Sequence, residues 1–125
     1  MIKVLLVDDN ASVRESIKYN LDKHPKIQII GECKDGKEVI PFLQRLKPDV
    51  ILMDYRMPIL NGIETTKLVK DLFPKIKVIG FSCNDDIITK EAFLKNGAAG
   101  FLSKYETDND VLVLEINNCC STVKG

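Results

Sequence analysis

The chain has 125 residues, of which 45% are hydrophobic and 29% charged, a balance typical of one globular domain with its own core. Its 18 basic residues equal its 18 acidic ones, which argues against a dedicated nucleic-acid-binding protein, because such proteins usually carry a basic excess. No stretch approaches the ~20 apolar residues of a membrane span. The start, MIKVLLVDDN, turns acidic too early for a signal peptide. We therefore expect a cytoplasmic protein without membrane attachment.

Five short apolar stretches recur along the chain, and the first is rich in β-branched residues. Their spacing of roughly 20 to 25 residues leaves room for a helix in each connection. The first, IKVLLV, is apolar on both faces, as expected for a strand buried in a parallel sheet. The predicted strands cover residues 2–7, 27–33, 49–53, 77–81 and 98–102.

Helical patterns separate these strands. Val13, Ile17 and Leu21 recur every fourth residue and predict the first helix. In the second, DGKEVIPFLQRL, Asp35 is near the expected cap, and Pro41 predicts a kink or a delayed start.

The remaining three helices have clear end signals. Asn61 is a candidate N-cap for the third helix, which should stop at Pro74. The fourth opens with acidic residues and should end at Asn96 and Gly97, a typical glycine C-cap. The last is expected from about residue 107 to about Cys120.

A strand-helix unit repeated five times without interruption predicts an α/β fold. The expected architecture is a single doubly wound, five-stranded parallel sheet with helices on both faces. We find no internal linker or low-complexity segment in the sequence, so residues 1–125 are expected to form one domain.

Polar residues that could bind a ligand or take part in a reaction follow four of the predicted strands. Asp8 and Asp9 follow the first strand, Asp54 the third, Ser82 the fourth and Lys104 the fifth. In open parallel sheets, ligands bind beyond the carboxyl ends of the strands, which meet at one edge. We therefore expect these five side chains to converge.

Three carboxylates in one cleft repel one another unless a cation neutralises them. Oxygen ligands suit a hard divalent ion such as Mg²⁺, which also accepts phosphate oxygens. With the Ser82 hydroxyl and the Lys104 ammonium added, the cleft could hold a phosphoryl group on three sides. Asp54 would then be the nucleophile that forms an acyl phosphate.

Simpler interpretations exist for each residue alone. Asp8, Asp9 or Asn10 could cap the first helix. Ser82 could be an ordinary loop serine and Lys104 a solvated surface charge. Helix capping, however, does not explain a lysine after the fifth strand.

Two other protein classes share this architecture. A flavodoxin-like electron carrier must hold a flavin phosphate in its first loop, where Asp8 and Asp9 would repel it, and the chain has no tryptophan to stack on a flavin. A phosphohydrolase of the aspartyl-phosphate type typically carries a second acid two residues after the nucleophile, where this chain has Arg56.

The segments VDDN, DYRMPILNG and GAAGFLSK, together with the serine after the fourth strand, resemble the receiver domain of two-component response regulators. The resemblance covers essentially the whole chain, and GAAGFLSKYE is similar to NarL/LuxR-type receivers. It implies a flavodoxin-like (βα)5 fold with strand order 2-1-3-4-5. A degenerate receiver that acts only as an interaction module is the nearest alternative, and the complete residue set speaks against it.

The resemblance implies a role for each acidic residue. Asp54 would be the phosphoacceptor, and Asp9 and Asp54 would bind Mg²⁺ together with the backbone carbonyl of Arg56. Asp8 would act on the ion mostly through water. Arg56 and Asn84 would flank the site and influence the lifetime of the phosphoryl group.

The same resemblance implies a switch. Ser82 would be the hydroxyl that moves toward the phosphate, Lys104 its counter-ion, and Phe101 the aromatic residue that turns inward. Many receivers have proline after this lysine. The chain has Tyr105 there, which leaves a cis peptide after Lys104 in doubt.

By resemblance, the chain is a phosphorylation-dependent signalling switch rather than a conventional enzyme. It would take its phosphoryl group from a sensor histidine kinase, promote the transfer itself and lose the group slowly. NarL-type receivers precede a helix-turn-helix domain that binds DNA and regulates transcription. No such domain fits in 125 residues, so we expect an excised receiver rather than a stand-alone one, with CCSTVKG as the start of a linker.

The last predicted helix is apolar over an unusually wide surface. One stripe should face the sheet, and further apolar residues lie beyond it. Excess apolar width indicates either a deeply set helix or a partner surface, such as that of a homodimer. The stripe comprises Leu112, Ile116, Cys119 and Val123, and the additional residues are Val111, Val113 and Leu114.

The cysteines form no C-x-x-C pair and no metal-binding spacing with the single histidine. Adjacent cysteines on a helix make poor disulfide partners, because neighbouring helical side chains diverge. We therefore expect free thiols in a reducing compartment. The four are Cys33, Cys83, Cys119 and Cys120.

Overall fold

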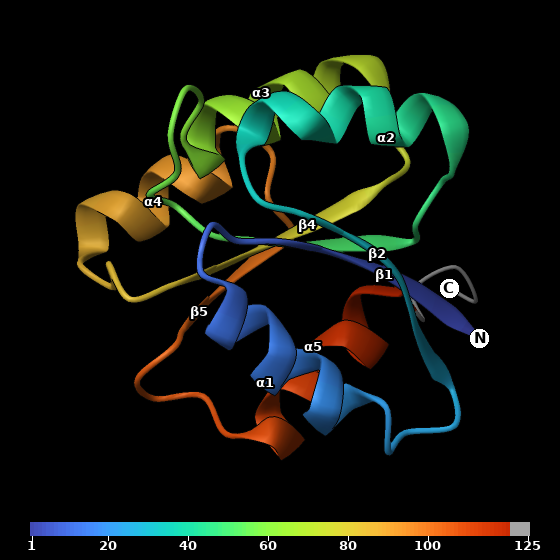
Figure 1. The fold of residues 1–125 in the computed structure, drawn as a ribbon. Helices are drawn as coiled ribbons and strands as arrows, with labels where there is room; N and C mark the ends of the chain where they lie inside the picture. The colour runs from blue at the N-terminus through green and yellow to red at the C-terminus, as the bar shows by residue number, and fades with distance from the viewer. Residues whose placement is uncertain (121–125) are drawn as a thin grey trace.

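The computed structural model describes residues 1–120 and confirms the predicted strand-helix alternation (Figure 1). The strands are β1 (Ile2–Val7), β2 (Ile27–Cys33), β3 (Val50–Met53), β4 (Lys77–Ser82) and β5 (Gly100–Ser103). The helices are α1 (Ala11–Leu21), α2 (Val39–Arg45), α3 (Gly62–Leu72), α4 (Ile87–Lys95) and α5 (Asn109–Cys120), with a short 3₁₀ helix, η1 (Gly36–Glu38), before α2.

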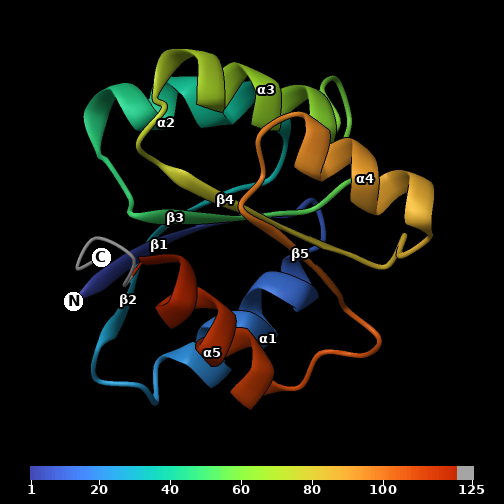
Figure 2. The same ribbon diagram turned by 180° about the vertical axis from the view of Figure 1, so that it is seen from behind.

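The strands form one parallel sheet in the order β2-β1-β3-β4-β5, as expected for a doubly wound fold. Helices α2, α3 and α4 cover one face, and α1 and α5 cover the other (Figures 1 and 2). The flavodoxin-like arrangement is therefore confirmed.

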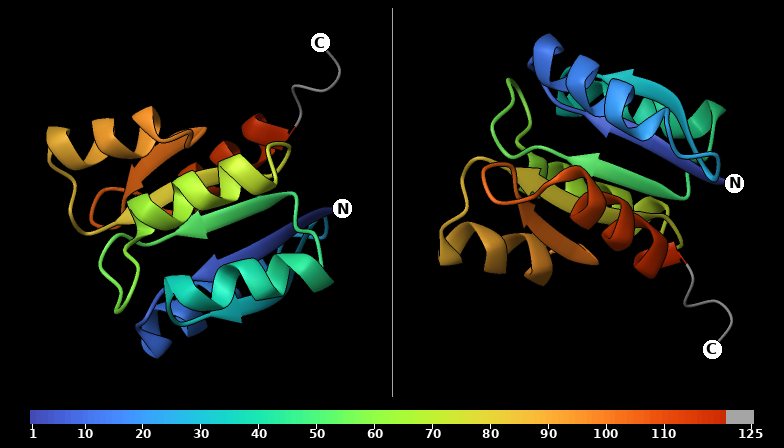
Figure 3. Two further views of the ribbon diagram at one scale, coloured as in Figure 1. Left: turned by 90° about the horizontal axis from the view of Figure 1, so that it is seen from above. Right: turned by 90° about the horizontal axis from the view of Figure 1, so that it is seen from below.

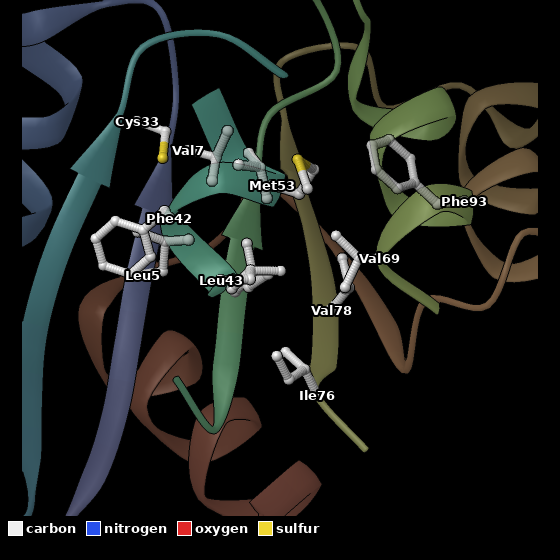
Figure 4. Close-up of a cluster of buried hydrophobic side chains, with 12 residues drawn as sticks. Leu5, Val7, Cys33, Phe42, Leu43, Met53, Val69, Ile76, Val78 and Phe93 are labelled. Carbon is white, nitrogen blue, oxygen red and sulfur yellow. The ribbon is translucent and has the colours of Figure 1, made fainter. Parts of the chain in front are cut away.

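The sheet separates two apolar clusters. One lies between the sheet and helices α2, α3 and α4 and includes Leu5, Ile51 and Phe93, all fully buried (Figure 4). The other lies on the α1 and α5 side and includes Val4 and Leu52. Because alternate residues of the central strands enter opposite clusters, these strands are apolar on both faces, as the sequence indicated.

Helix caps follow the predicted signals and decide one open question. The side chain of Asn10, not that of Asp8 or Asp9, accepts the capping hydrogen bond from the N–H of Val13, at 3.2 Å. Asn61 caps α3 in a reciprocal capping box with Glu64. The capping interpretation is thus wrong for the two aspartates, and Asp8 Oδ1 instead accepts a hydrogen bond from the N–H of Asn10 at 2.9 Å.

The delayed start predicted at Pro41 is present. Asp35 caps η1, and α2 begins only at Val39. Pro41 is the third residue of α2, in a first turn where the backbone N–H groups need no helical partner.

Helix α5 combines a buried stripe with an exposed apolar surface. Leu112 and Ile116 are buried, whereas Val111 is 41% and Leu114 58% exposed. The predicted stripe is confirmed at these two buried positions, and its last member, Val123, lies outside the described residues.

The carboxyl ends of the strands lie at one edge of the sheet. The N-terminus and the C-terminal end of α5 lie at the opposite edge (Figure 3). Among residues 1–120, no helix has both the length and the apolar character needed to cross a bilayer.

Candidate functional site

Strand register brings the first two carboxylates together. Val7, the last residue of β1, pairs with Met53, the last residue of β3. The N–H of Asp54 donates to the Val7 carbonyl at 2.9 Å, which extends the ladder by one residue. Asp8 follows Val7 directly, so Asp8 and Asp54 leave neighbouring strands at the same level.

Strands β4 and β5 end in the same way. Ser82 pairs with Ser103, and the N–H of Lys104 donates to the Ser82 carbonyl at 3.0 Å. Lys104 therefore starts at the same edge of the sheet, and its long side chain can reach back across β4 toward β3.

The predicted carboxylates do converge. Asp8, Asp9 and Asp54 each place one oxygen within 4.8 Å of the others. Asp8 is only 3% and Asp54 8% exposed, whereas Asp9 is exposed. Two buried carboxylates and one exposed carboxylate thus form a site of strong negative charge, which we name the carboxylate cluster.

Lys104 enters this cluster. Its Nζ donates to Asp8 Oδ2 and lies 3.3 Å from Asp54 Oδ1. The lysine side chain is only 12% exposed, so the interpretation as a solvated surface charge is wrong. Burial by itself would lower the pKa of Lys104, but the hydrogen bond to Asp8 and the charge of Asp54 outweigh it and raise that pKa.

The positive charge of Lys104 does not fully neutralise the carboxylates of the cluster. Burial raises the pKa of Asp54 to about 6, against the opposing influence of the Lys104 charge and with a further contribution from Asp8. An additional cation would stabilise the ionised form. The all-oxygen donor set of Asp8, Asp9 and Asp54 fits a hard divalent ion such as Mg²⁺.

Ser82 is buried at the end of β4, with 1% exposure, so it is not an ordinary loop serine. Its Oγ accepts a hydrogen bond from the N–H of Asn84 at 3.0 Å. Asn84 Oδ1 in turn accepts one from Arg56 Nε at 3.0 Å. We call these three residues the loop bridge, because they connect the loop after β3 to the loop after β4.

Phe101 lies on β5, partly buried against the α4 side. Its ring packs on Phe93 at a centroid distance of 5.5 Å, and Phe93 contacts Tyr55 edge-on at 6.3 Å. An aromatic chain therefore runs from Phe101 to the residue after Asp54. Residues 1–120 contain no cis peptide bond, so the bond after Lys104 is trans.

Two structural supports of the site were not predicted. Arg14 on α1 donates to the Asp8 carbonyl at 2.6 Å and to Glu32 Oε1 at 2.8 Å, which holds the end of β1 in place. Gly62, the first residue of α3, sits directly on Asp54, since a Cβ there would lie 1.8 Å from the Asp54 carbonyl oxygen. Glycine in a helix start is a weak sequence signal by itself.

Comparisons with known proteins agree with this geometry. The family model described as response regulator receiver domain matches residues 4–117. The chain is 36% identical over 112 residues to the transcriptional regulatory protein DegU of Brevibacillus brevis, covering 90% of this chain and 47% of that protein. It is 42% identical over 106 residues to a protein-glutamate methylesterase/protein-glutamine glutaminase of Thermotoga maritima, covering 83% of this chain and 30% of that protein.

A solved structure supports the same conclusion. The signal receiver domain of the response regulator NarL from Mycobacterium tuberculosis superposes with a TM-score of 0.89 at 28% identity, over 96% of both chains. The chain belongs to the response regulator receiver domain family. It spans less than half the length of the two curated relatives above.

Replacing Lys104 should destabilise the domain. In Lys104→Gln, Asp8 and Asp54 stay buried without their cation, and we expect the free energy of unfolding to fall by about 2–4 kcal/mol in the absence of divalent ions. Urea unfolding measures this loss. The double variant Lys104→Gln/Asp54→Asn should recover part of it, and Lys67→Gln, which breaks only an exposed pair with Asp71, should change little. A Lys104→Gln variant as stable as the wild type would contradict the buried ion pair.

Replacing Asp54 should stabilise the metal-free domain in a pH-dependent way. Burial raises the folded-state pKa of Asp54 from 3.8 to about 6. The unfolded chain therefore ionises at a lower pH than the folded chain, so the wild type loses stability as the pH rises from about 3.8 to about 6. Asp54→Asn avoids this loss. We expect a gain of about 2 kcal/mol at pH 7.5 that disappears near pH 4. Urea unfolding with chelator at both pH values checks it, with Asp71→Asn as the exposed control. A gain that is equal at both pH values would be evidence against a raised pKa.

Proposed function

We propose that this receiver domain is a phosphorylation-dependent switch that accepts a phosphoryl group on Asp54 from the phosphohistidine of a sensor histidine kinase. The observation that carries the proposal is the carboxylate cluster with Lys104 bound to two of its members. A purely structural role would not favour three acids around one lysine, because the acids repel one another and are partly desolvated. Such a cluster is suited to binding a further cation.

Mg²⁺ is the proposed cofactor. Asp9 and Asp54 would hold it with the backbone carbonyl of Arg56, and Asp8 would contribute mostly through water. When bound, the ion neutralises charge on the transferred phosphoryl group and on the acids that surround it.

The residues of the chain supply the rest of the chemistry. An oxygen of Asp54 attacks phosphorus as the bond to the donor nitrogen breaks, which moves the phosphoryl group from histidine to aspartate. The Lys104 ammonium, already 3.3 Å from Asp54, would then bind a phosphoryl oxygen. Ser82 accepts its hydrogen bond from Asn84, so its own hydroxyl hydrogen is available to donate to the same group.

The switch itself would follow from these contacts. We propose that Ser82 moves toward the phosphoryl group and that Phe101 turns inward, which changes the surface near β4, β5 and their helices. Slow hydrolysis of the acyl phosphate would reset the domain, and Arg56 and Asn84 would influence its rate. The domain is thus not a conventional enzyme, although it promotes its own modification.

We further propose a cytoplasmic protein whose output is control of transcription through a DNA-binding domain outside this chain. The similarity to the transcriptional regulatory protein DegU over its receiver portion supports this output. The similar receiver of a protein-glutamate methylesterase from Thermotoga maritima indicates the alternative, an enzymatic output domain.

Phosphorylation should be visible by mass. Incubation with Mg²⁺ and acetyl phosphate is expected to add one phosphoryl group to the intact protein, and hydroxylamine should remove it because an acyl phosphate is labile. Asp54→Asn should abolish the addition, whereas the exposed Asp71→Asn should be modified like the wild type. Modification that persists in Asp54→Asn would show that another residue is the acceptor. Loss of the addition when Mg²⁺ is chelated would support the metal requirement.

We propose that phosphorylation promotes homodimerisation through α5 and its neighbours, because Val111 and Leu114 are exposed there. Sedimentation velocity with Mg²⁺, with and without beryllofluoride, tests this. The expected result is a larger dimer fraction with beryllofluoride that is reduced in Leu114→Ser and unchanged in Leu72→Ser, which alters an exposed leucine on α3. A monomer at all concentrations with beryllofluoride would exclude the dimer.

A further inference from the structure

The C-terminal end of α5 lies at the sheet edge opposite the carboxyl ends of the strands (Figure 3). Two thiols approach each other there. Cys119 and Cys120 are the last residues of this helix, and their Sγ atoms lie 3.7 Å apart. Both side chains are half-buried and pack against the apolar cluster on the α1 and α5 side. Neighbouring helical side chains normally diverge, so their convergence is a specific feature of this helix end. We call the two residues the thiol pair.

The separation of the thiol pair does not suit a disulfide. A disulfide brings two sulfur atoms to about 2.05 Å and usually holds the Cα atoms more than about 4.4 Å apart, whereas adjacent residues have Cα atoms about 3.8 Å apart. The observed 3.7 Å is the separation of an S–H···S hydrogen bond, and it also fits two sulfur atoms bound to one metal ion. Two thiolates bound to one tetrahedral Zn²⁺ at about 2.3 Å each lie about 3.8 Å from one another. The thiol pair already has this spacing.

The surrounding charges favour a cation. Glu115 and Asp49 place carboxylates near the thiols, with Lys77 as the opposing charge. Hydrogen bonding with Cys119 lowers the pKa of Cys120 and raises that of Cys119, so one of the two protons is more easily lost. Loss of the first proton by Cys120 would give a thiolate that attracts a soft cation.

We propose that Cys119 and Cys120 form a chelating site for a thiophilic divalent cation with a filled d shell, such as Zn²⁺ or Cd²⁺. Binding breaks two S–H bonds and forms two sulfur-metal bonds, and the two protons pass to solvent. The remaining coordination positions are taken by water. Sulfur ligands select such ions over Mg²⁺, and the all-oxygen carboxylate cluster has the opposite preference, so the two sites would not compete for Mg²⁺.

Titration with Cd²⁺ tests the site directly. The reduced protein is kept at neutral pH with saturating Mg²⁺, and the ultraviolet charge-transfer band of cadmium-thiolate bonds is measured. One equivalent of Cd²⁺ is expected to saturate the band in the wild type. Cys119→Ser and Cys120→Ser should each bind at least about tenfold more weakly, because a second thiolate on the same chain acts at high effective concentration.

The other cysteines provide the control. Cys83 is exposed and has no cysteine neighbour, so Cys83→Ser should bind Cd²⁺ like the wild type. Cys33 is left in place, because burial raises its pKa to about 12 and keeps it protonated. Wild-type affinity in Cys119→Ser, or a band that disappears only in Cys83→Ser, would overturn the proposal.

A second measurement needs no variant. Alkylation with N-ethylmaleimide, followed by peptide mass analysis, is carried out on the wild type with and without one equivalent of Cd²⁺. The expected result is protection of Cys119 and Cys120 together while Cys83 reacts at its original rate. Unchanged alkylation of the thiol pair in the presence of Cd²⁺ would reject the site even if the serine variants failed to fold.

Discussion

The contact of one lysine with two buried carboxylates is the interaction on which the rest of the site depends. Asp8 and Asp54 are almost out of water, Asp9 stands at the rim, and Lys104 supplies one positive charge to three acids. Such a cluster is under-neutralised and stores unfavourable electrostatic energy. A divalent ion relieves it. In the proposed function, the ion and the lysine would together balance the charge of a phosphoryl group received by Asp54.

The sheet makes this contact possible. Parallel strands in register end at one level, so residues that are far apart in the sequence leave β1, β3 and β5 at the same edge of the sheet, with β4 between β3 and β5. The sheet fixes the backbone from which the carboxylates extend, since the N–H of Asp8 donates to the Cys33 carbonyl and the N–H of Asp54 to the Val7 carbonyl. Arg14 and Gly62 add local constraints, one by holding the Asp8 carbonyl and the other by allowing α3 to begin against Asp54.

Much of this arrangement could be predicted from the sequence. The runs IKVLLV and IQIIGEC matched β1 and β2 residue for residue. For β1 the reason is that a strand inside a parallel sheet needs apolar side chains on both faces, whereas β2 lies at the edge of the sheet and exposes Gln28 and Glu32. The convergence of Asp8, Asp54 and Lys104 followed from topology alone. The loop bridge and the role of Arg14 depend on side-chain conformations. For Cys119 and Cys120, helical geometry argued against a disulfide but did not predict that the two sulfur atoms approach each other. These side-chain contacts depend on how the helices and loops pack together, which the local sequence pattern does not specify.

The loop bridge has a consequence for recognition at this edge of the molecule. Asn84 binds Ser82 through its backbone and Arg56 through its side chain, so the serine and the arginine are held by a single residue. In the proposed switch, Ser82 would turn toward the newly attached group, so Asn84 would lose one of its two anchors and the Arg56 guanidinium would no longer be fixed in direction. On the proposed function, a kinase that contacts this edge would meet a differently oriented positive charge before and after transfer, and this difference would let it distinguish the unmodified domain from the phosphorylated one.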